Sequence, residues 1–207
     1  MTSTEHLPII GITMGDPAGI GPEIICSALA PGNIRQFCRP VVIGDTGVLR
    51  KASDLLKLPL DFQKVESVDH AVFDRKPVTV IEGRPVDAEK MMPGLPTPET
   101  GKAMLSYIEN GVALAMEKKI DAMVTAPVTK SALKLAGSEY HGHTELISNR
   151  TGADRYAMML TGNRLKVVLV TIHMPLSRVP GSLTREKVLE TIEICCNSRV
   201  ERFGIQQ

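Results

Sequence analysis

Hydrophobic residues occur along this chain in short continuous runs that are separated by more polar segments. Continuous runs are typical of strands buried on both faces, as in parallel sheets, whereas half-exposed strands alternate apolar and polar residues. The runs that predict strands are Pro8 to Met14, Pro40 to Ile43, Val78 to Ile81, Ala122 to Thr125, Tyr156 to Leu160 and Val167 to Ile172.

Helical patterns lie between several of these runs. The predicted helices are Pro22–Leu29, Thr46–Leu56, Pro98–Lys118, Thr129–Leu135, Thr144–Thr151 and Thr184–Phe203. Thr97, Pro98 and Glu99 supply an N-cap, a first-turn proline and an early acid for the third of them. The alternation of strand and helix predicts an α/β architecture with right-handed crossovers.

Composition narrows the class of protein. The chain has 207 residues, 43% of them hydrophobic and 23% charged, as in ordinary globular proteins. A net charge of +1, 3% aromatic residues and no tryptophan argue against nucleic acid or an anionic membrane as a partner. The apolar runs are too short to cross a bilayer, and the four cysteines form no C-x-x-C pair. We therefore expect a soluble, cytoplasmic protein with reduced thiols.

Two segments bear on domain organisation. The proline-rich stretch Met91–Pro98 predicts a loop that crosses between subdomains. The last predicted helix stops at Gly204, where a glycine C-cap is expected, and in a βα-alternating protein a strand should follow. We therefore predict that residues 1–207 form one incomplete domain and that the chain is truncated after Gln207.

The first segment that could carry chemistry is Met14 to Glu23 (MGDPAGIGPE), which directly follows the first predicted strand. Its glycines and prolines predict a sharply turned loop before a helix N-terminus, where backbone N–H groups can approach an anion. The glycine spacing differs from the G-x-G-x-x-G fingerprint of dinucleotide sites. A turn with purely structural glycines is an equally good interpretation.

Three further segments place polar groups where predicted strands end or helices begin. Lys130 closes TAPVTK after the fourth predicted strand, and in open α/β sheets ligands bind beyond the carboxyl ends of strands. The segment Tyr140 to Glu145 (YHGHTE) brings imidazoles and a hydroxyl to a helix start, where a phosphate or a metal could bind. His173 follows the predicted strand VVLVTI and is a candidate metal ligand. Taken singly, a surface lysine and a structural histidine are the better explanations of Lys130 and His173, and H-x-H often proves to be an ordinary polar turn.

The series MGDPAGIGPE, TAPVTK, GHTE and VTIHMPL, in this order, resembles the PdxA family of dehydrogenases over essentially the whole chain. The resemblance implies a fold like that of isocitrate and isopropylmalate dehydrogenases, with two α/β/α lobes of which the C-terminal part is missing here. It implies a homodimer whose active site lies at the subunit interface. It also implies NAD(P)-dependent oxidation of 4-(phosphooxy)-L-threonine, in pyridoxal phosphate (vitamin B6) biosynthesis. The 3-oxo acid so formed would decarboxylate to 3-amino-2-oxopropyl phosphate.

The resemblance also implies roles for individual residues. His143 and Thr144 would contact the substrate, and His173 would be one of the histidines that hold a divalent metal (Zn, Mg or Co). Asp16 and Lys130 lie in family motifs without a firm role. The family's remaining metal and substrate ligands would lie beyond Gln207, so we expect the 207-residue chain to be inactive by itself.

The chain departs from the family at two positions. Thr129 stands where the family often has asparagine, and His141 stands where an apolar or small residue is common. These departures leave two alternatives open. One is a dehydrogenase of 4-phospho-D-threonate or 4-phospho-D-erythronate, and the other is a non-catalytic fragment of the same fold.

Overall fold

The computed structural model describes residues 7–73, 77–140 and 142–203. The chain divides into two compact units, Met1–Thr151 and Gly152–Gln207. Among the described residues, no helix is long and apolar enough to cross a membrane. The expected α/β fold class is confirmed, and the two units are built differently.

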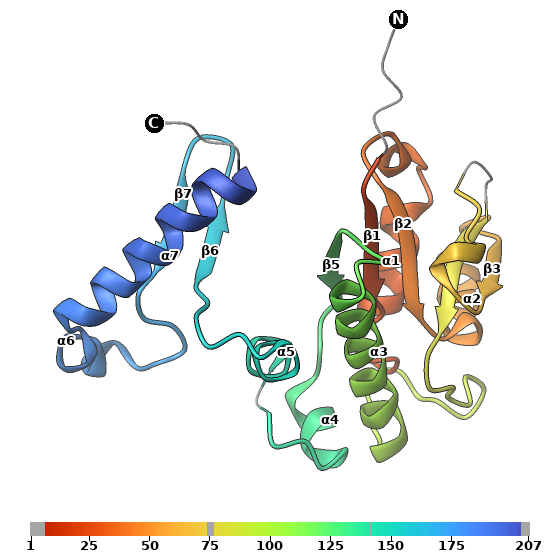
Figure 1. The fold of residues 1–207 in the computed structure, drawn as a ribbon. Helices are drawn as coiled ribbons and strands as arrows, with labels where there is room; N and C mark the ends of the chain where they lie inside the picture. The colour runs from red at the N-terminus through yellow and green to blue at the C-terminus, as the bar shows by residue number, and fades with distance from the viewer. Residues whose placement is uncertain (1–6, 74–76, 141, 204–207) are drawn as a thin grey trace, which may run out of the picture. The chain divides into compact units, whose positions relative to one another are not determined.

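The first unit is organised around a five-stranded parallel sheet (Figure 1). Its strands lie in the order β3-β4-β2-β1-β5. The strands are β1 (Ile9–Thr13), β2 (Arg39–Gly44), β3 (Phe62–Val65), β4 (Val78–Glu82) and β5 (Ala122–Thr125). Four of these five were predicted from their continuous apolar runs. β3, an edge strand, was missed because two adjacent polar residues lie between the apolar ends of FQKV, so it contains no continuous apolar run.

Helices cover both faces of this sheet. They are α1 (Gly21–Leu29), α2 (Thr46–Leu55) and α3 (Pro98–Met116), with short 3-10 helices η1 (Asn33–Gln36) and η2 (Val68–His70). The chain moves from β1 to β2 in one direction across the sheet and from β4 to β5 in the other. Because crossovers between parallel strands are right-handed, this reversal places α3 on the face opposite to α1 and α2.

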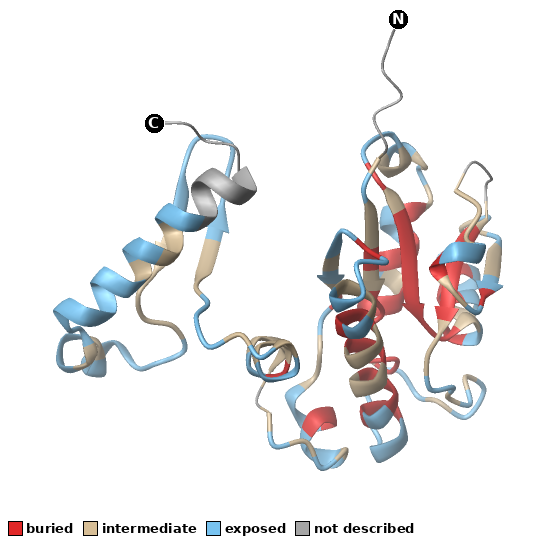
Figure 2. Cartoon of the chain, viewed as in Figure 1, coloured by how far each residue is buried: buried red, intermediate tan, exposed pale blue. Residues whose placement is uncertain are grey.

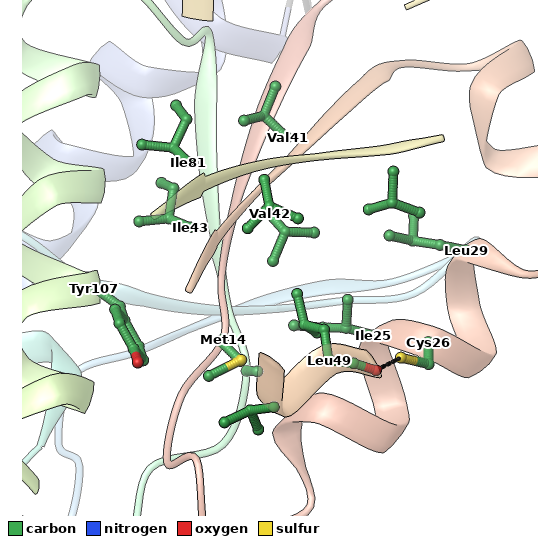
Figure 3. Packing of buried hydrophobic residues seen from close by; sticks show 14 of the residues in the cluster. Met14, Ile25, Cys26, Leu29, Val41, Val42, Ile43, Leu49, Ile81 and Tyr107 are labelled. Atoms are coloured by element: carbon green, nitrogen blue, oxygen red, sulfur yellow. Dashed lines mark hydrogen bonds between the residues drawn. The ribbon is translucent and has the colours of Figure 1, made fainter. Parts of the chain in front are cut away.

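The core lies where β2 is buried from both sides. Val41, Val42 and Ile43 are consecutive and completely inaccessible to solvent, as the continuous run in the sequence predicts. Figure 2 shows the buried residues concentrated in the strands and in the helix faces turned toward them. Figure 3 shows the same cluster from close by, with the Cys26 thiol donating a 3.5 Å hydrogen bond to the Leu49 carbonyl.

Two further helices pack on α3. Helix α4 (Lys130–Leu135) approaches it closely, since a Cβ on Gly101 would lie 2.3 Å from the Ala132 carbonyl oxygen. Helix α5 (His143–Thr151) buries Leu146 against Ile108 and Val112 of α3. The predicted cap of α3 is confirmed, because the Thr97 hydroxyl accepts a hydrogen bond from the Thr100 amide.

The second unit differs from the prediction of buried parallel strands. Strands β6 (Met158–Thr161) and β7 (Lys166–Leu169) form an antiparallel pair. They are followed by η3 (Leu176–Arg178), α6 (Val179–Ser182) and α7 (Arg185–Phe203). Leu160 is 58% exposed and Leu165 69% exposed. The two predicted apolar runs of this unit do contain strands, but the described residues of the unit leave these strands partly exposed to solvent.

Other expectations had mixed outcomes. The Met91–Pro98 segment is a loop, but it lies inside the first unit, and the division between units falls after Thr151. The expected cap at Gly204 lies outside the described residues. All four cysteines are free; Cys26 and Cys38 are buried in the first unit, Cys195 is half-buried and Cys196 is exposed in the second.

The close packing of Gly21 against the Met14 carbonyl at the start of α1 can be tested by its effect on stability. A Cβ on Gly21 would lie 2.2 Å from the Met14 carbonyl oxygen, so we expect Gly21→Ala to lower the free energy of unfolding by at least about 2 kcal/mol. Urea denaturation followed by tyrosine fluorescence measures this change. Gly142→Ala is the matched control, because no atom of the described residues, apart from Gly142 itself and its two chain neighbours, lies within 4 Å of the added Cβ. Equal stability of the two variants would contradict the prediction.

Candidate functional site

The reversal of strand order defines the place where a ligand site is expected. β1 leads to α1 on one face of the sheet, whereas β5 leads to α4, which packs on α3 on the other face. Ligands of open α/β sheets bind at such a switch point, beyond the carboxyl ends of the strands. The motifs MGDPAGIGPE and TAPVTK follow β1 and β5, so the structure brings these two predicted segments together.

The two segments are joined by main-chain contacts. The Asp16 amide donates a 3.2 Å hydrogen bond to the Pro127 carbonyl, and the Ala126 amide donates to the Thr13 carbonyl at 3.0 Å. Gly15 has a φ of 73°, and a Cβ there would lie 2.4 Å from the Pro127 oxygen. The glycine is therefore required by chain packing, and this favours the structural interpretation of the loop glycines over a phosphate cradle.

Asp16 is 1% exposed and belongs to this junction. Its Oδ1 atom accepts a 3.0 Å hydrogen bond from the Ala18 amide, and its carbonyl accepts one from Gly19 at 2.9 Å. These bonds fix the turn between β1 and α1. The geometry thus gives Asp16 a part in holding the loop, and a direct role toward a ligand stays a prediction.

Lys130 is the first residue of α4 and is exposed. Thr129, where the chain departs from the family pattern, is the N-cap of this helix and makes no side-chain capping bond. Lys130 therefore occupies the predicted place beyond β5, where its ammonium group is accessible to an anion.

His143 and Thr144 are the first two residues of α5. The Nε2 atom of His143 is buried and has no hydrogen-bond partner among the described residues. Burial disfavours the charged imidazolium and lowers the pKa of His143 below its usual value. A neutral imidazole with an unsatisfied ring nitrogen is suited to hydrogen bonding with a bound molecule. His141 lies outside the described residues.

His173 is not placed as predicted. β7 ends at Leu169, so the histidine lies in the turn that follows the strand rather than at the end of the strand itself. The reason is that β7 pairs with β6 alone among the described strands, and the pairing begins and ends with Lys166 and Leu169. The side chain of His173 is exposed, and its backbone has a left-handed φ of 53°. Left-handed conformations are uncommon for non-glycine residues and often accompany functional positions.

A metal centre is not completed by the described residues. Nowhere in residues 7–73, 77–140 and 142–203 do three or more His, Cys, Asp or Glu side chains gather in a way that could hold a metal ion. A hollow of about 330 Å³ in the second unit is lined by Tyr156, Ile172 and Lys187 among others, but not by His173.

One residue with an unusual environment in the structure was not predicted from the sequence to belong to the site. Glu23 ends the first motif and lies in the first turn of α1. Its Oε2 atom is buried and has no hydrogen-bond partner among the described residues. The sequence does place this acidic residue at a helix N-terminus after a glycine- and proline-rich loop. The same pattern is found at ordinary helix starts, so it did not distinguish Glu23 as a site residue.

The class of protein follows from this arrangement. The first unit is an open, doubly wound α/β sheet whose candidate site lies at the topological switch point. Residues 36–207 match the family model described as "Pyridoxal phosphate biosynthetic protein PdxA". The chain therefore belongs to the PdxA family.

Individual relatives agree with this assignment. A 4-hydroxythreonine-4-phosphate dehydrogenase of Desulforapulum autotrophicum is 47% identical over 99% of this chain and 60% of its own length. A D-threonate 4-phosphate dehydrogenase of Cupriavidus necator is 39% identical over 92% of this chain and 57% of its own length. The chain thus spans about 60% of the length of the curated relatives it matches.

Solved structures show the same fold. The crystal structure of a 4-hydroxythreonine-4-phosphate dehydrogenase from Klebsiella pneumoniae superposes with a TM-score of 0.89 at 34% sequence identity. The match covers 98% of this chain and 61% of that one.

The half-buried imidazole of His143 gives a test by pH. In the unfolded chain His143 titrates near 6.5, and in the folded protein its pKa is lower. As the pH falls below 6.5, the unfolded chain takes up a proton that the folded protein does not, so the free energy of unfolding decreases. We expect His143→Gln to lose less stability than the unmutated chain between about pH 7.5 and about pH 5.5, measured by urea denaturation. His70→Gln is the control, because His70 is exposed. Parallel losses in the unmutated chain and in His143→Gln would refute this.

Proposed function

We propose that the protein is a dehydrogenase that oxidises 4-(phosphooxy)-L-threonine with NAD or NADP, in pyridoxal phosphate biosynthesis. The observation that carries the proposal is the 47% identity to a 4-hydroxythreonine-4-phosphate dehydrogenase over 99% of this chain. The family match over residues 36–207 supports it independently.

The proposed reaction has two parts. The secondary alcohol of the substrate loses a hydride from its carbon and a proton from its hydroxyl, which leaves a 3-oxo acid. This product then loses carbon dioxide and becomes 3-amino-2-oxopropyl phosphate. The nicotinamide cofactor supplies the hydride acceptor when it is bound.

Residues at the start of α5 are proposed to hold the substrate. The buried, unpartnered Nε2 atom of His143 supports this role, because a bound polar group would satisfy it. Thr144 adds a hydroxyl one residue further along the same turn. The free N–H groups of the first turn favour a negatively charged group, such as the phosphate or carboxylate of this substrate. Lys130 is proposed as a cationic contact and Asp16 as the residue that fixes the neighbouring loop.

His173 is proposed as one ligand of a divalent metal. Its exposed side chain and left-handed backbone are compatible with a ligand that reaches out from a turn. Zinc usually takes at least three protein ligands, and the described residues provide no such group. The metal, the nucleotide and the homodimer therefore rest on the family resemblance, and the described geometry supplies no complete site for them.

A second substrate is a specific alternative. The Cupriavidus necator relative is a D-threonate 4-phosphate dehydrogenase and is 39% identical to this chain. Both substrates are phosphorylated four-carbon hydroxy acids. The threonine derivative carries an amino group where the sugar acid carries a hydroxyl. The segment that contains His141 and Thr129 is where the chain departs from the family pattern, so discrimination between the two substrates is expected there.

Kinetics on the two substrates test the proposed activity. With the protein expressed from its complete reading frame, we expect kcat/KM for 4-(phosphooxy)-L-threonine to exceed that for 4-phospho-D-threonate by at least about tenfold, because a site built for an amino group rejects a hydroxyl. Formation of reduced nicotinamide is followed with NAD and with NADP. A preference for the sugar acid would select the alternative, and turnover of neither substrate would exclude both.

Substitution of His173 tests the metal proposal. In the same protein we expect His173→Asn to reduce bound divalent metal and kcat by at least about a hundredfold, with the melting temperature nearly unchanged. Asparagine is chosen because it tolerates the left-handed backbone. His70→Asn is the matched control at an exposed histidine. A variant that unfolds, yet keeps full activity per folded molecule, would show that His173 is structural.

A further inference from the structure

A small apolar cluster on α3 joins two of the candidate-site segments. Its buried members are Ile108 and Val112 of α3 and Leu146 of α5. Val128, in the segment TAPVTK, and Tyr140, which begins the segment YHGHTE, are partly buried and pack against these three residues. The loop after β5 and the chain that enters α5 are therefore held on the same surface of α3.

Tyr140 is attached to its surroundings at three points. Its side chain packs on the cluster, and its amide donates a 3.2 Å hydrogen bond to the Ser138 hydroxyl. Its phenolic hydroxyl donates a 2.8 Å hydrogen bond to the side-chain oxygen of Asn149, in the second turn of α5. Because the helix rises by about 9 Å between His143 and Asn149, this bond requires the chain at Tyr140 to lie beside α5 rather than beyond its end.

His143 lies between two residues that the cluster holds. Leu146 follows it by three positions and is 1% exposed, and the Leu146 amide donates a 3.4 Å hydrogen bond to the Gly142 carbonyl in the first turn of α5. Tyr140 precedes His143 by three positions, and its bond to Asn149 ties the entering chain back to the helix. The depth at which the imidazole is held therefore depends on both attachments.

From these contacts we infer that Tyr140 is a positioning residue, which holds the imidazole of His143 at the start of α5 through its hydrogen bond to Asn149. The inference rests on the proposed function in one respect, because it is there that His143 becomes a substrate contact. Loss of the bond would displace His143 without removing a group that touches the substrate. One hydrogen bond of this kind changes a local equilibrium by about fivefold.

Titration of the His143 ring in the 207-residue chain tests the positioning. Tyr140→Phe keeps the ring on the cluster and removes the donor, and Asn149→Ala removes the acceptor. In either variant we expect the pKa of His143 to rise toward its usual 6.5, because the loosened chain admits water to the imidazole. Proton NMR of the ring measures this pKa, and His143→Gln identifies the signal. The double variant should show the same pKa as each single one, because all three lack the same bond.

Tyr156→Phe is the matched control for the titration. It removes the hydroxyl of a tyrosine in the second unit and should leave the pKa of His143 unchanged. An unchanged pKa in both Tyr140→Phe and Asn149→Ala, even with a lower melting temperature, would show that the bond serves stability alone. Shifts that add in the double variant would show that the two residues act separately. Either result would overturn the inference.

Kinetics separate this inference from the proposed function. In the protein expressed from its complete reading frame, Tyr140→Phe should raise KM for 4-(phosphooxy)-L-threonine about fivefold and change kcat by less than about twofold, because the variant disturbs a substrate contact. Turnover with an unchanged KM in this variant would overturn the positioning role. No turnover by the unmutated protein would instead exclude the proposed function, and the imidazole titration alone would then decide whether Tyr140 positions His143.

Discussion

The hydrogen bond from the Asp16 amide to the Pro127 carbonyl joins the two loops on which the candidate site depends. The loops leave the paired strands β1 and β5 and run to opposite faces of the sheet, so this bond holds them together beyond the end of the ladder. The left-handed Gly15 allows the chains to come this close, since any side chain there would meet the Pro127 oxygen. The same contact lies between the strand ends and the starts of α1 and α4.

The rest of the first unit can be understood from this constraint. With β1 and β5 fixed side by side, α3 lies across their face and provides the surface on which α4 and α5 pack. The packing of Leu146 on α3 in turn fixes the start of α5. His143 therefore owes its buried ring nitrogen to contacts that lie far from it in the sequence.

The sequence predicted the parts of the fold that depend on continuous apolar runs. Val41 to Ile43 is such a run, and it is buried on both faces because helices cover both sides of β2. The run from Val167 to Ile172 looks the same, yet Val167 is 40% exposed. An apolar run indicates that burial of the segment is favourable, but it does not identify the helix or strand that covers it.

For the candidate site, the sequence predicted the segments that contribute to it but not the environment of individual atoms. The two motifs were each predicted to follow a strand, and the structure shows that these strands, β1 and β5, are neighbours, so the motifs lie at one edge of the sheet. The unsatisfied atoms of His143 and Glu23 were not predictable, because the burial of one atom depends on tertiary packing. The left-handed turn at His173 was hidden for the same reason, since the apolar run predicted a strand that reaches Ile172, directly before the histidine.

The distribution of thiols has a consequence for observing how this chain moves. Cys26 is completely buried, and burial, with the nearby Glu23 charge, raises its pKa to about 11. A thiol reagent therefore reaches Cys26 only when the first unit opens, whereas Cys196 is exposed in the second unit from the start. The reaction rate of Cys26 therefore reports the opening of the first unit, and Cys196, which reacts without any opening, gives the reference rate of an accessible thiol in the same chain.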